Sequence, residues 1–332
     1  MVSRERFMKS LAAFGVAAML LPLFAGTADA AKYTIRLALI AAAGQPIEQG
    51  AQLFKKRVEE GSNGAIEVKI FPGGQLGGEI QLQDSVSTGI IQMASIGTPV
   101  MSGKLKKLDI LNMYYLWRDR EHMKKVLQGA IGKDLFTEYE KATKIRILAA
   151  NWQQGTRQTV TKRAVKSPAD FKGVKIRVTA GVPIYDQLWT AMGTNPVPLS
   201  FNEAYSSMQT GVVDAIELPP DFILNNGFDK LGSHLIMTSH YVYSNVLMVN
   251  ELFFNKLPDD LKALMTEAAV EAGDFQTNLV ITEEKKVLDK LGSGNLTVVT
   301  PDVEAFARSV RPVFEANMAV WGQDLYDKIM AE

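Results

Sequence analysis

One arginine lies inside an apolar strand pattern, where its charge could bind an anion. In the segment 174–178 apolar residues alternate with charged ones, so the apolar side chains share one face and Arg177 leaves the other. This position is near the end of the predicted strand at which α/β sheets bind ligands. A guanidinium there presents a planar fork that matches a carboxylate. A structural salt bridge or a solvated arginine would produce the same pattern, so these alternatives stay open at this point.

The sequence contains little that could carry catalysis. It has no cysteine, which excludes disulfides, thiolate nucleophiles and cysteine-ligated metals. The three histidines are too scattered for a metal cluster: we expect His122 on a solvated helical surface, and His234 and His240 in structural roles. The chain lacks the G-x-S-x-G, G-x-G-x-x-G, Walker and H-E-x-x-H motifs. We therefore predict no enzymatic activity, no cofactor and no metal site.

Two further features have simple structural interpretations. Glu217 follows the apolar segment 212–216, and a buried glutamate there needs a hydrogen-bond partner within the protein. The glycine-rich segment 73–78 lacks the Lys-Ser/Thr pair that would bind phosphates, so it is interpreted as a turn.

The charge balance excludes one large class of partner. The 332 residues include 36 basic and 36 acidic side chains, whereas a nucleic-acid-binding protein normally has a large basic surplus. The length allows one large domain or two of roughly 150 residues.

Residues 1–30 have the layout of a secretory signal. Basic residues precede an uncharged apolar run, 11–24, and the segment ends in the small-x-small sequence Ala28-Asp29-Ala30. The apolar run is shorter than the ~20 residues that a membrane-spanning helix needs. We predict export to the periplasm with cleavage after Ala30.

Strands and helices alternate in the first half of the exported chain. The apolar residues of 47–58 fall on one helical face, and 65–70 alternates as a strand should. A helix over 79–88 and a strand over 90–96 repeat this order, and Gly61 is expected to supply the left-handed residue that ends the first helix. The order indicates parallel sheets covered by helices, hence an α/β fold.

The same order restarts in the second half. Capping boxes at Ser167–Asp170 and Ser200–Glu203 predict two helix starts, and strands are expected at 174–178 and 212–216. A long helix is expected from Pro258 to about Leu291. Two α/β halves with a long late helix predict two lobes whose interface is the ligand site.

Several short segments, in a fixed order and spacing, carry a family resemblance. The most specific is Ser167–Val178, which reads S-P-A-D-F-K-G-V-K-I-R-V. The others are 71–77, 155–158, 196–198, 203–205, 208–214 and 238–241. Together they span nearly the whole exported chain and resemble the solute-binding subunit of tripartite ATP-independent periplasmic (TRAP) transporters, the DctP family.

The resemblance implies a two-lobed periplasmic-binding-protein fold with a hinge. We expect residues 31–154 and about 244–283 in lobe I, and 155–243 and about 284–332 in lobe II. The implied partners are a small-molecule carboxylate ligand and the small and large membrane subunits of the transporter.

The resemblance also assigns candidate ligand contacts. In the family the arginine of the K-I-R-V strand, here Arg177, pairs with the ligand carboxylate. The arginine of the G-T-R segment, here Arg157, often gives a second contact. The aromatic residue after Pro196-Val197-Pro198, here Phe201, commonly packs beside the ligand.

The chain departs from its relatives at two polar positions. Leu218, beside the candidate Glu217, stands where relatives often have an asparagine that hydrogen-bonds the ligand. Ala180 falls where sialate-binding members carry an asparagine. These replacements favour a carboxylate with an apolar body, such as a keto acid or an aromatic acid, over a heavily hydroxylated sugar acid. Trp152 and Trp189 are further candidates to line such a site.

The sequence thus predicts an extracytoplasmic receptor that delivers a small organic acid to a membrane TRAP transporter. One alternative is a binding protein of an ATP-driven importer for a carboxylate or amino acid, because it shares the two-lobed design. A second alternative, an exported hydrolase, is weakened by the lack of a triad or metal motif.

Overall fold

The computed structural model describes residues 31–332, so the expected signal and its cleavage site lie outside the described residues. Within them, nine strands form one mixed sheet, in the order β2-β1-β3-β8-β4-β7-β5-β6 with β9 beside β8. The strands are β1 Tyr33–Leu39, β2 Ile66–Phe71, β3 Met93–Gly97, β4 Ile145–Thr161, β5 Lys175–Thr179, β6 Asn195–Leu199, β7 Ala215–Leu218, β8 His234–Asn250 and β9 Thr297–Val299.

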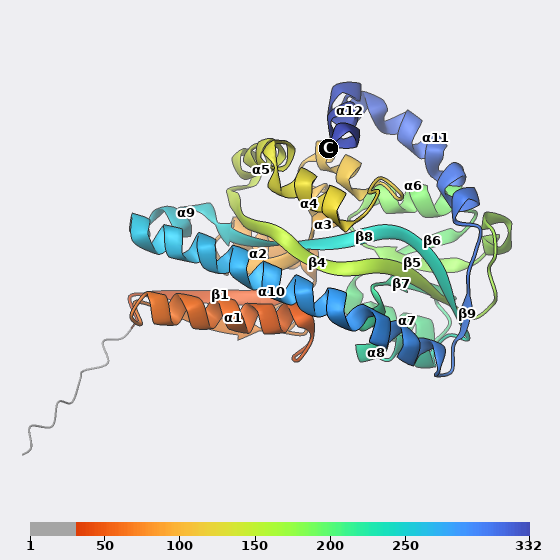
Figure 1. Cartoon of the computed structure of the whole chain (residues 1–332), viewed down its shortest axis with the longest axis horizontal. Helices are drawn as coiled ribbons and strands as arrows, with labels where there is room; N and C mark the ends of the chain where they lie inside the picture. The colour runs from red at the N-terminus through yellow and green to blue at the C-terminus, as the bar shows by residue number, and fades with distance from the viewer. Residues whose placement is uncertain (1–30) are drawn as a thin grey trace, which may run out of the picture. The chain divides into compact units, whose positions relative to one another are not determined.

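Helices cover both faces of this sheet (Figure 1). The longer ones are α1 Pro46–Gly61, α2 Glu79–Ser87, α4 Arg120–Gln128, α5 Ala130–Thr143, α6 Pro183–Ala191, α7 Phe201–Gln209, α10 Asp259–Gly292, α11 Val303–Trp321 and α12 Gln323–Ala331. The shorter ones are α3 Thr98–Met101, α8 Pro220–Asn225, α9 Glu251–Asn255 and the 3-10 helices η1 Lys106–Asn112, η2 Pro168–Phe171 and η3 Phe228–Lys230. In residues 31–332, no helix combines the length and the apolar composition that a membrane span requires.

The α/β prediction is confirmed, but the sheet is mixed rather than parallel. The N-terminal strand group, β1 to β3, pairs in parallel, and so does the middle strand group, β5 to β7. The long strands β4 and β8 join the two groups through antiparallel pairings. Each long strand has 17 residues and was not expected from the sequence, because its burial pattern is nearly continuous rather than alternating.

The hydrophobic core is divided by the faces of the sheet. Along β1, Ile35 and Leu37 belong to one apolar cluster, while Ala38 belongs to the other. One cluster packs under α1, α7, α8 and α10; the other lies under α2, α6 and α11, on the opposite side in Figure 1. Each cluster therefore runs through both strand groups, because successive side chains of a strand point to opposite faces.

The long late helix is present as α10, whose 34 residues span about 51 Å at the usual rise per residue. It packs along β4 and contacts α1 at one end of the sheet and α8 at the other.

The expectation that Gly61 supplies the left-handed residue after the first helix is wrong. Gly61 is the last residue of α1, and a Cβ there would lie 2.6 Å from Leu264 of α10; the left-handed residues are Asn63 and Gly64. Gly61 thus permits close helix packing rather than a turn.

Two more expectations about local structure are wrong. The strand expected at 212–216 begins only at Ala215, because Gly211 has a φ of +79° and Val213 hydrogen-bonds back to Ser207. Glu217 is therefore inside β7 rather than after it.

His122 is buried rather than solvated. Its Nδ1 accepts from the Arg118 backbone, and its Nε2 lies 2.7 Å from the carbonyl oxygen of Ile329.

Candidate functional site

A narrow cavity lies where the two strand groups meet the long central strands. It offers about 30 Å³, which is room for roughly two water molecules. Four residues singled out in the sequence line it: Arg157 from β4, Arg177 from β5, Phe201 from α7 and Leu218 from β7. The fold thus brings together side chains that are up to 61 positions apart in the sequence.

Arg177 is a buried cation, and no carboxylate of residues 31–332 pairs with it. Its side chain is in the middle of β5 and the residue is 2% exposed. Nε donates to the carbonyl oxygen of Leu199 at 3.0 Å, and Nη1 lies 3.4 Å from Oγ1 of Thr179. Within residues 31–332 it forms no salt bridge. Burial lowers its pKa to about 10, with Arg157 acting in the same direction and Glu217 opposing. The group stays protonated at neutral pH and is suited to receive an anion.

Arg157 is held by a carboxylate from the neighbouring strand. β4 pairs with β7 so that Thr159 lies opposite Glu217, and the guanidinium of Arg157 reaches its side chain through Nε and Nη2. Nη2 also donates to the Glu217 carbonyl oxygen at 2.7 Å. Burial would lower the pKa of Arg157, but attraction and hydrogen bonding from Glu217 raise it. Its charge centre lies 4.5 Å from the centre of the Tyr243 ring, a cation–π contact.

His240 completes this network behind Arg157. Its Nε2 lies 3.1 Å from Oε2 of Glu217, and its Nδ1 lies 2.9 Å from Oγ1 of Thr238. Burial lowers the pKa of His240, although Glu217 opposes this, so a neutral ring with its proton on Nε2 fits both contacts. Burial alone would raise the pKa of Glu217, yet Arg157 and His240 hold it at about 2. Glu217 therefore orients Arg157 and does not line the cavity.

The two tryptophan candidates lie in the core rather than at the cavity. Trp152 is fully buried, and its Nε1 donates to the carbonyl oxygen of Ala269 in α10 at 3.1 Å. Trp189 packs edge-on against Phe171 and His240. Neither lines the cavity, and their sequence context gave no sign of this because aromatic residues at strand and helix positions serve both purposes.

Sequence reasoning missed several cavity residues. Glu79, the first residue of α2, accepts from the backbone of Gly97 at 2.7 Å and from the Tyr243 hydroxyl at 3.4 Å. Gln154 and Asn245 are joined at 2.5 Å between their side chains. Of these residues, only Glu79 could have been found from the sequence, because it directly follows the glycine-rich segment 73–78.

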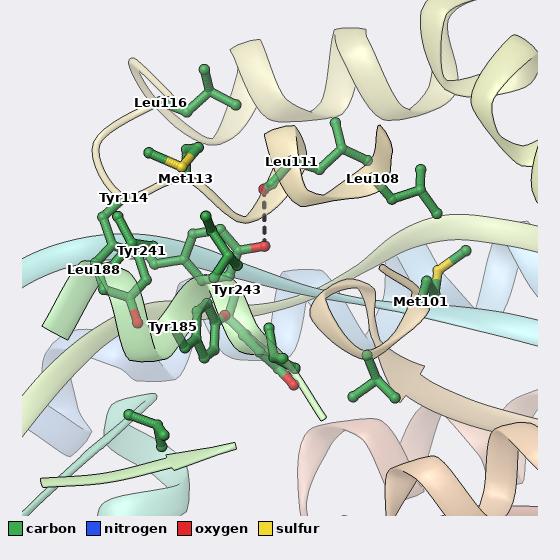
Figure 2. Packing of buried hydrophobic residues seen from close by; sticks show 14 of the residues in the cluster. Met101, Leu108, Leu111, Met113, Tyr114, Leu116, Tyr185, Leu188, Tyr241 and Tyr243 are labelled. Atoms are coloured by element: carbon green, nitrogen blue, oxygen red, sulfur yellow. Dashed lines mark hydrogen bonds between the residues drawn. The ribbon is translucent and has the colours of Figure 1, made fainter. Parts of the chain in front are cut away.

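Four tyrosines, Tyr114, Tyr185, Tyr241 and Tyr243, belong to the buried cluster shown in Figure 2. Tyr243 borders the cavity, and behind it Tyr241 donates from its hydroxyl to the carbonyl oxygen of Leu111 at 3.1 Å. Tyr185 and Tyr114 pack against each other with ring centres 5.3 Å apart. This packed aromatic layer fixes the position of Tyr243 and, through it, the ring contact to Arg157.

A wider outer chamber adjoins the narrow cavity. It has a volume of about 320 Å³ and shares Glu79, Thr179 and Phe201 with the inner cavity. Ile80 and Ala180 are among its apolar lining residues. Ile80 of α2 also touches the turn after β5, since a Cβ on Gly181 would overlap its Cδ1. The two strand groups therefore meet at this chamber.

Comparison with known proteins identifies the family. The sequence matches the model of DctP, bacterial extracellular solute-binding protein family 7, over residues 37–319. It is 32% identical over 261 residues to the 2,3-diketo-L-gulonate-binding periplasmic protein YiaO of Escherichia coli, covering 77% of this chain and 78% of that protein. It is 27% identical to the sialic acid-binding periplasmic protein SiaP of Vibrio cholerae, covering 94% and 97%.

A solved structure of a related protein supports the same family assignment. A TRAP periplasmic solute binding protein from Pseudomonas putida F1, with bound D-glucuronate, superposes with a TM-score of 0.86 at 28% identity, covering 90% of this chain and 97% of that one. The expected two-lobed α/β fold is thereby confirmed. The matches favour the TRAP interpretation over an ATP-driven importer or a hydrolase. This chain belongs to the DctP family of bacterial extracellular solute-binding proteins, the solute-binding subunits of TRAP transporters.

Proposed function

We propose that this protein binds a small organic acid through Arg177 and delivers it to the small and large membrane subunits of a TRAP transporter. The observation that carries the proposal is the buried guanidinium of Arg177, which borders the cavity without a carboxylate partner in residues 31–332. A buried charge is costly unless it is paired, so a ligand carboxylate would supply the missing partner.

Arg157 makes a second contact with the same carboxylate in this proposal. Its Nε and Nη2 are occupied by Glu217, which leaves Nη1 for a ligand oxygen. The narrow cavity accommodates a carboxylate-sized group, and the rest of the acid extends into the outer chamber. Glu217 and His240 act on the ligand only by orienting Arg157.

The acid has one carboxylate and a largely apolar body. Leu218, Phe201 and Phe222 line the inner cavity, and Ile80 lines the outer chamber. The carboxylate of Glu79 borders both spaces, so a second ligand carboxylate there would be repelled. The related proteins named above bind or contain sugar acids, which supports the carboxylate class but not the identity of the body.

Binding proceeds without turnover, by closure of two lobes. We place lobe I at residues 31–154 and about 244–283, and lobe II at 155–243 and about 284–332. The elements that cross between them are β4, β8 and α10, which fits a hinge made of continuous elements that bend. Export by a cleaved signal ending at Ala30 would place the receptor in the periplasm.

A thermal-shift screen tests the proposal. Purified protein is heated with phenylpyruvate, a branched 2-keto acid, D-glucuronate and succinate, each at several concentrations. An acid at ~100 times its dissociation constant adds ~2.7 kcal/mol to the unfolding free energy. We expect the keto acids to raise the melting temperature more than succinate does.

The arginine is tested in the same assay. Arg177→Ala removes a charge-assisted contact of ~1.5–3 kcal/mol, so affinity should fall roughly tenfold to over a hundredfold. Arg308→Ala, in an exposed part of α11, is the matched control and should bind normally. Unchanged affinity in Arg177→Ala would remove the site assignment. Recovery of chemically altered acid, detected by mass spectrometry, would contradict binding without turnover.

A further inference from the structure

A second cavity lies beside the ligand cavity at the junction between the two strand groups. It has a volume of about 200 Å³ and shares Gln154 with the ligand cavity. One side is the segment before and at the start of α1, including Gly44 and Pro46; another is the start of α8, including Asp221; the third is α10, including Glu284. Relative movement of the two groups would therefore change this cavity.

One atom of each of two polar side chains at this junction is buried without a hydrogen-bond partner in residues 31–332. Asp221 is partly exposed as a residue, but its Oδ1 is buried and unpaired. Gln45, the residue before α1, is 3% exposed; its Oε1 accepts from the Ala42 backbone at 2.6 Å, while its Nε2 is buried and unpaired. The amide of Gln45 is close enough to Asp221 to favour its charged form. The junction thus brings a carboxylate of α8 towards an amide at the start of α1.

The charges around Asp221 are mostly negative or already paired. From α10, Glu283 and Glu284 line the same cavity, and Glu284 pairs with Arg120 of α4 at 2.6 Å. Glu283 pairs with Lys286 of the same helix at 2.7 Å. α8 also packs against β4 and η3, whose charged residues include Arg157, Asp229 and Lys230, and Glu48 lies in the first turn of α1. Arg157 is occupied by Glu217, and Glu48 accepts from Gly44 at 3.0 Å.

These surroundings disfavour the ionised form of Asp221. Burial raises its pKa to about 7, the charge of Glu284 acts in the same direction, and backbone and Gln45 donors oppose. Moving α8 away from α1 would return the carboxyl to water, where an aspartate has a pKa of ~3.9.

We propose that closing this junction takes up a proton at Asp221, so that the closed form is favoured in mildly acidic solution. The inference rests on the proposed function, because it concerns closure of the same two lobes. Between pH ~4 and about 7 the closed form binds one more proton than the open form. Closure is then favoured by up to about tenfold for each unit that the pH falls below 7, and it is independent of pH above that value.

Spin labels on the full exported chain test the proposal without any ligand. The chain has no cysteine, so Lys56→Cys in α1 and Gln209→Cys in α7 give two unique labels at exposed positions on the two strand groups. Pulsed electron-spin distances are measured at pH 5.5, 7 and 8. We expect the ratio of short-distance to long-distance populations to rise up to about thirtyfold from pH 8 to 5.5, and up to about fifteenfold from pH 7 to 5.5. A ratio that does not change with pH would overturn the proposal.

Two variants make the test specific. Asp221→Asn imitates the protonated side chain and should stay in the short-distance population at every pH. Asp229→Asn makes the same chemical change on η3, away from the cavity lining, and should respond as the parent does. A pH response retained in Asp221→Asn would overturn the proposal.

Carbon-13 NMR of aspartate-labelled protein gives a direct check. The signal that disappears in Asp221→Asn should titrate with a midpoint near 7, and a midpoint near the ordinary ~4 would overturn the inference. Failure here is distinguishable from failure of the proposed function, because acid binding that depends on Arg177 would still be seen in the thermal-shift assay.

Discussion

Two arginines border one cavity but differ in how their charges are balanced. Arg157 is neutralised within the protein by Glu217, whereas the polar contacts of Arg177 within residues 31–332 are the Leu199 carbonyl oxygen and the Thr179 hydroxyl. A buried charge that already has a counter-ion inside the protein gains little from a second one. A buried charge without a counter-ion gains more when an anionic ligand supplies it. In the proposed binding mode, we therefore expect Arg177 to contribute more to carboxylate affinity than Arg157 does.

At the residue scale, Glu217→Gln should be strongly destabilising. It leaves the buried Arg157 without a full counter-charge, and breaking a buried pair in this way costs about 3–5 kcal/mol. Urea unfolding at pH 7 measures the change, with Glu304→Gln at an exposed position of α11 as the control. A loss of less than about 1 kcal/mol would show that the pair is not essential to the fold.

The same pair predicts how stability depends on acid. The pKa of Glu217 is lowered in the folded protein, to about 2. The pair therefore makes its full contribution to the unfolding free energy at pH values above about 4.5, the ordinary pKa of a glutamate. It is lost as the pH falls from there through 2, because the unfolded chain then binds the extra proton. Unfolding free energies at pH 6, 4 and 3 should fall more steeply for the parent than for Glu217→Gln. Parallel curves would contradict this assignment.

At the element scale, β4 and α10 hold the two strand groups together. Trp152 of β4 bonds to Ala269 of α10, and Asn151 donates to the Val270 carbonyl oxygen at 2.8 Å. Gly273 allows this close approach, because a Cβ there would overlap the Asn151 side chain and lie 2.7 Å from Cδ1 of Trp152. Glycine is intrinsically unfavourable inside a helix, but at position 273 of α10 it is a packing requirement.

Gly273→Ala should therefore destabilise the protein, although alanine is intrinsically better in a helix by about 1 kcal/mol. Overpacking against β4 should lower the unfolding free energy by about 1–3 kcal/mol in urea denaturation. Thr266→Ala, at an exposed position of the same helix, is the control and should be neutral or stabilising. A higher unfolding free energy in Gly273→Ala would contradict this prediction, because it would mean that α10 can move away from β4 without loss of stability.

At the scale of the whole molecule, anion binding depends on local placement rather than on net charge. Residues 1–30 hold three of the 36 basic side chains and two of the 36 acidic ones, which leaves 33 against 34 in residues 31–332. A surface of this balance does not concentrate anions around it. The proposed carboxylate site therefore relies on the local charges of Arg177 and Arg157.

The association rate constant of an acid found in the screen should therefore change little with ionic strength. Between 20 and 300 mM salt we expect less than about a threefold change by stopped-flow fluorescence, since long-range steering is weak. In Arg177→Ala most of the affinity loss should lie in the dissociation rate. A steep fall of the association rate with salt would instead indicate a steering field that the charge count does not show.

The sequence alone determined the class of the fold and a part of its elements, and it put forward Arg177 as the main candidate for ligand binding. Capping boxes, alternation and the long apolar-and-charged helix are local patterns, so α7, β5 and α10 were predicted close to their observed bounds. The family resemblance supplied Arg157 and Phe201, which the structure brings to the same cavity as Arg177. These features are encoded in neighbouring residues or in the order of short segments.

Only the tertiary structure decided which polar groups meet. The pairing of Glu217 with both Arg157 and His240 depends on the register of β4 against β7 and β8. That register brings Arg157 to Glu217, which is 60 positions away in the sequence, so no local pattern reports it. The contacts of Glu79 depend on the start of α2 lying against β3 and β8. The same holds for Trp152, whose burial follows from the position of α10. Periodicity specifies which face a side chain takes, whereas packing between distant segments specifies its partner.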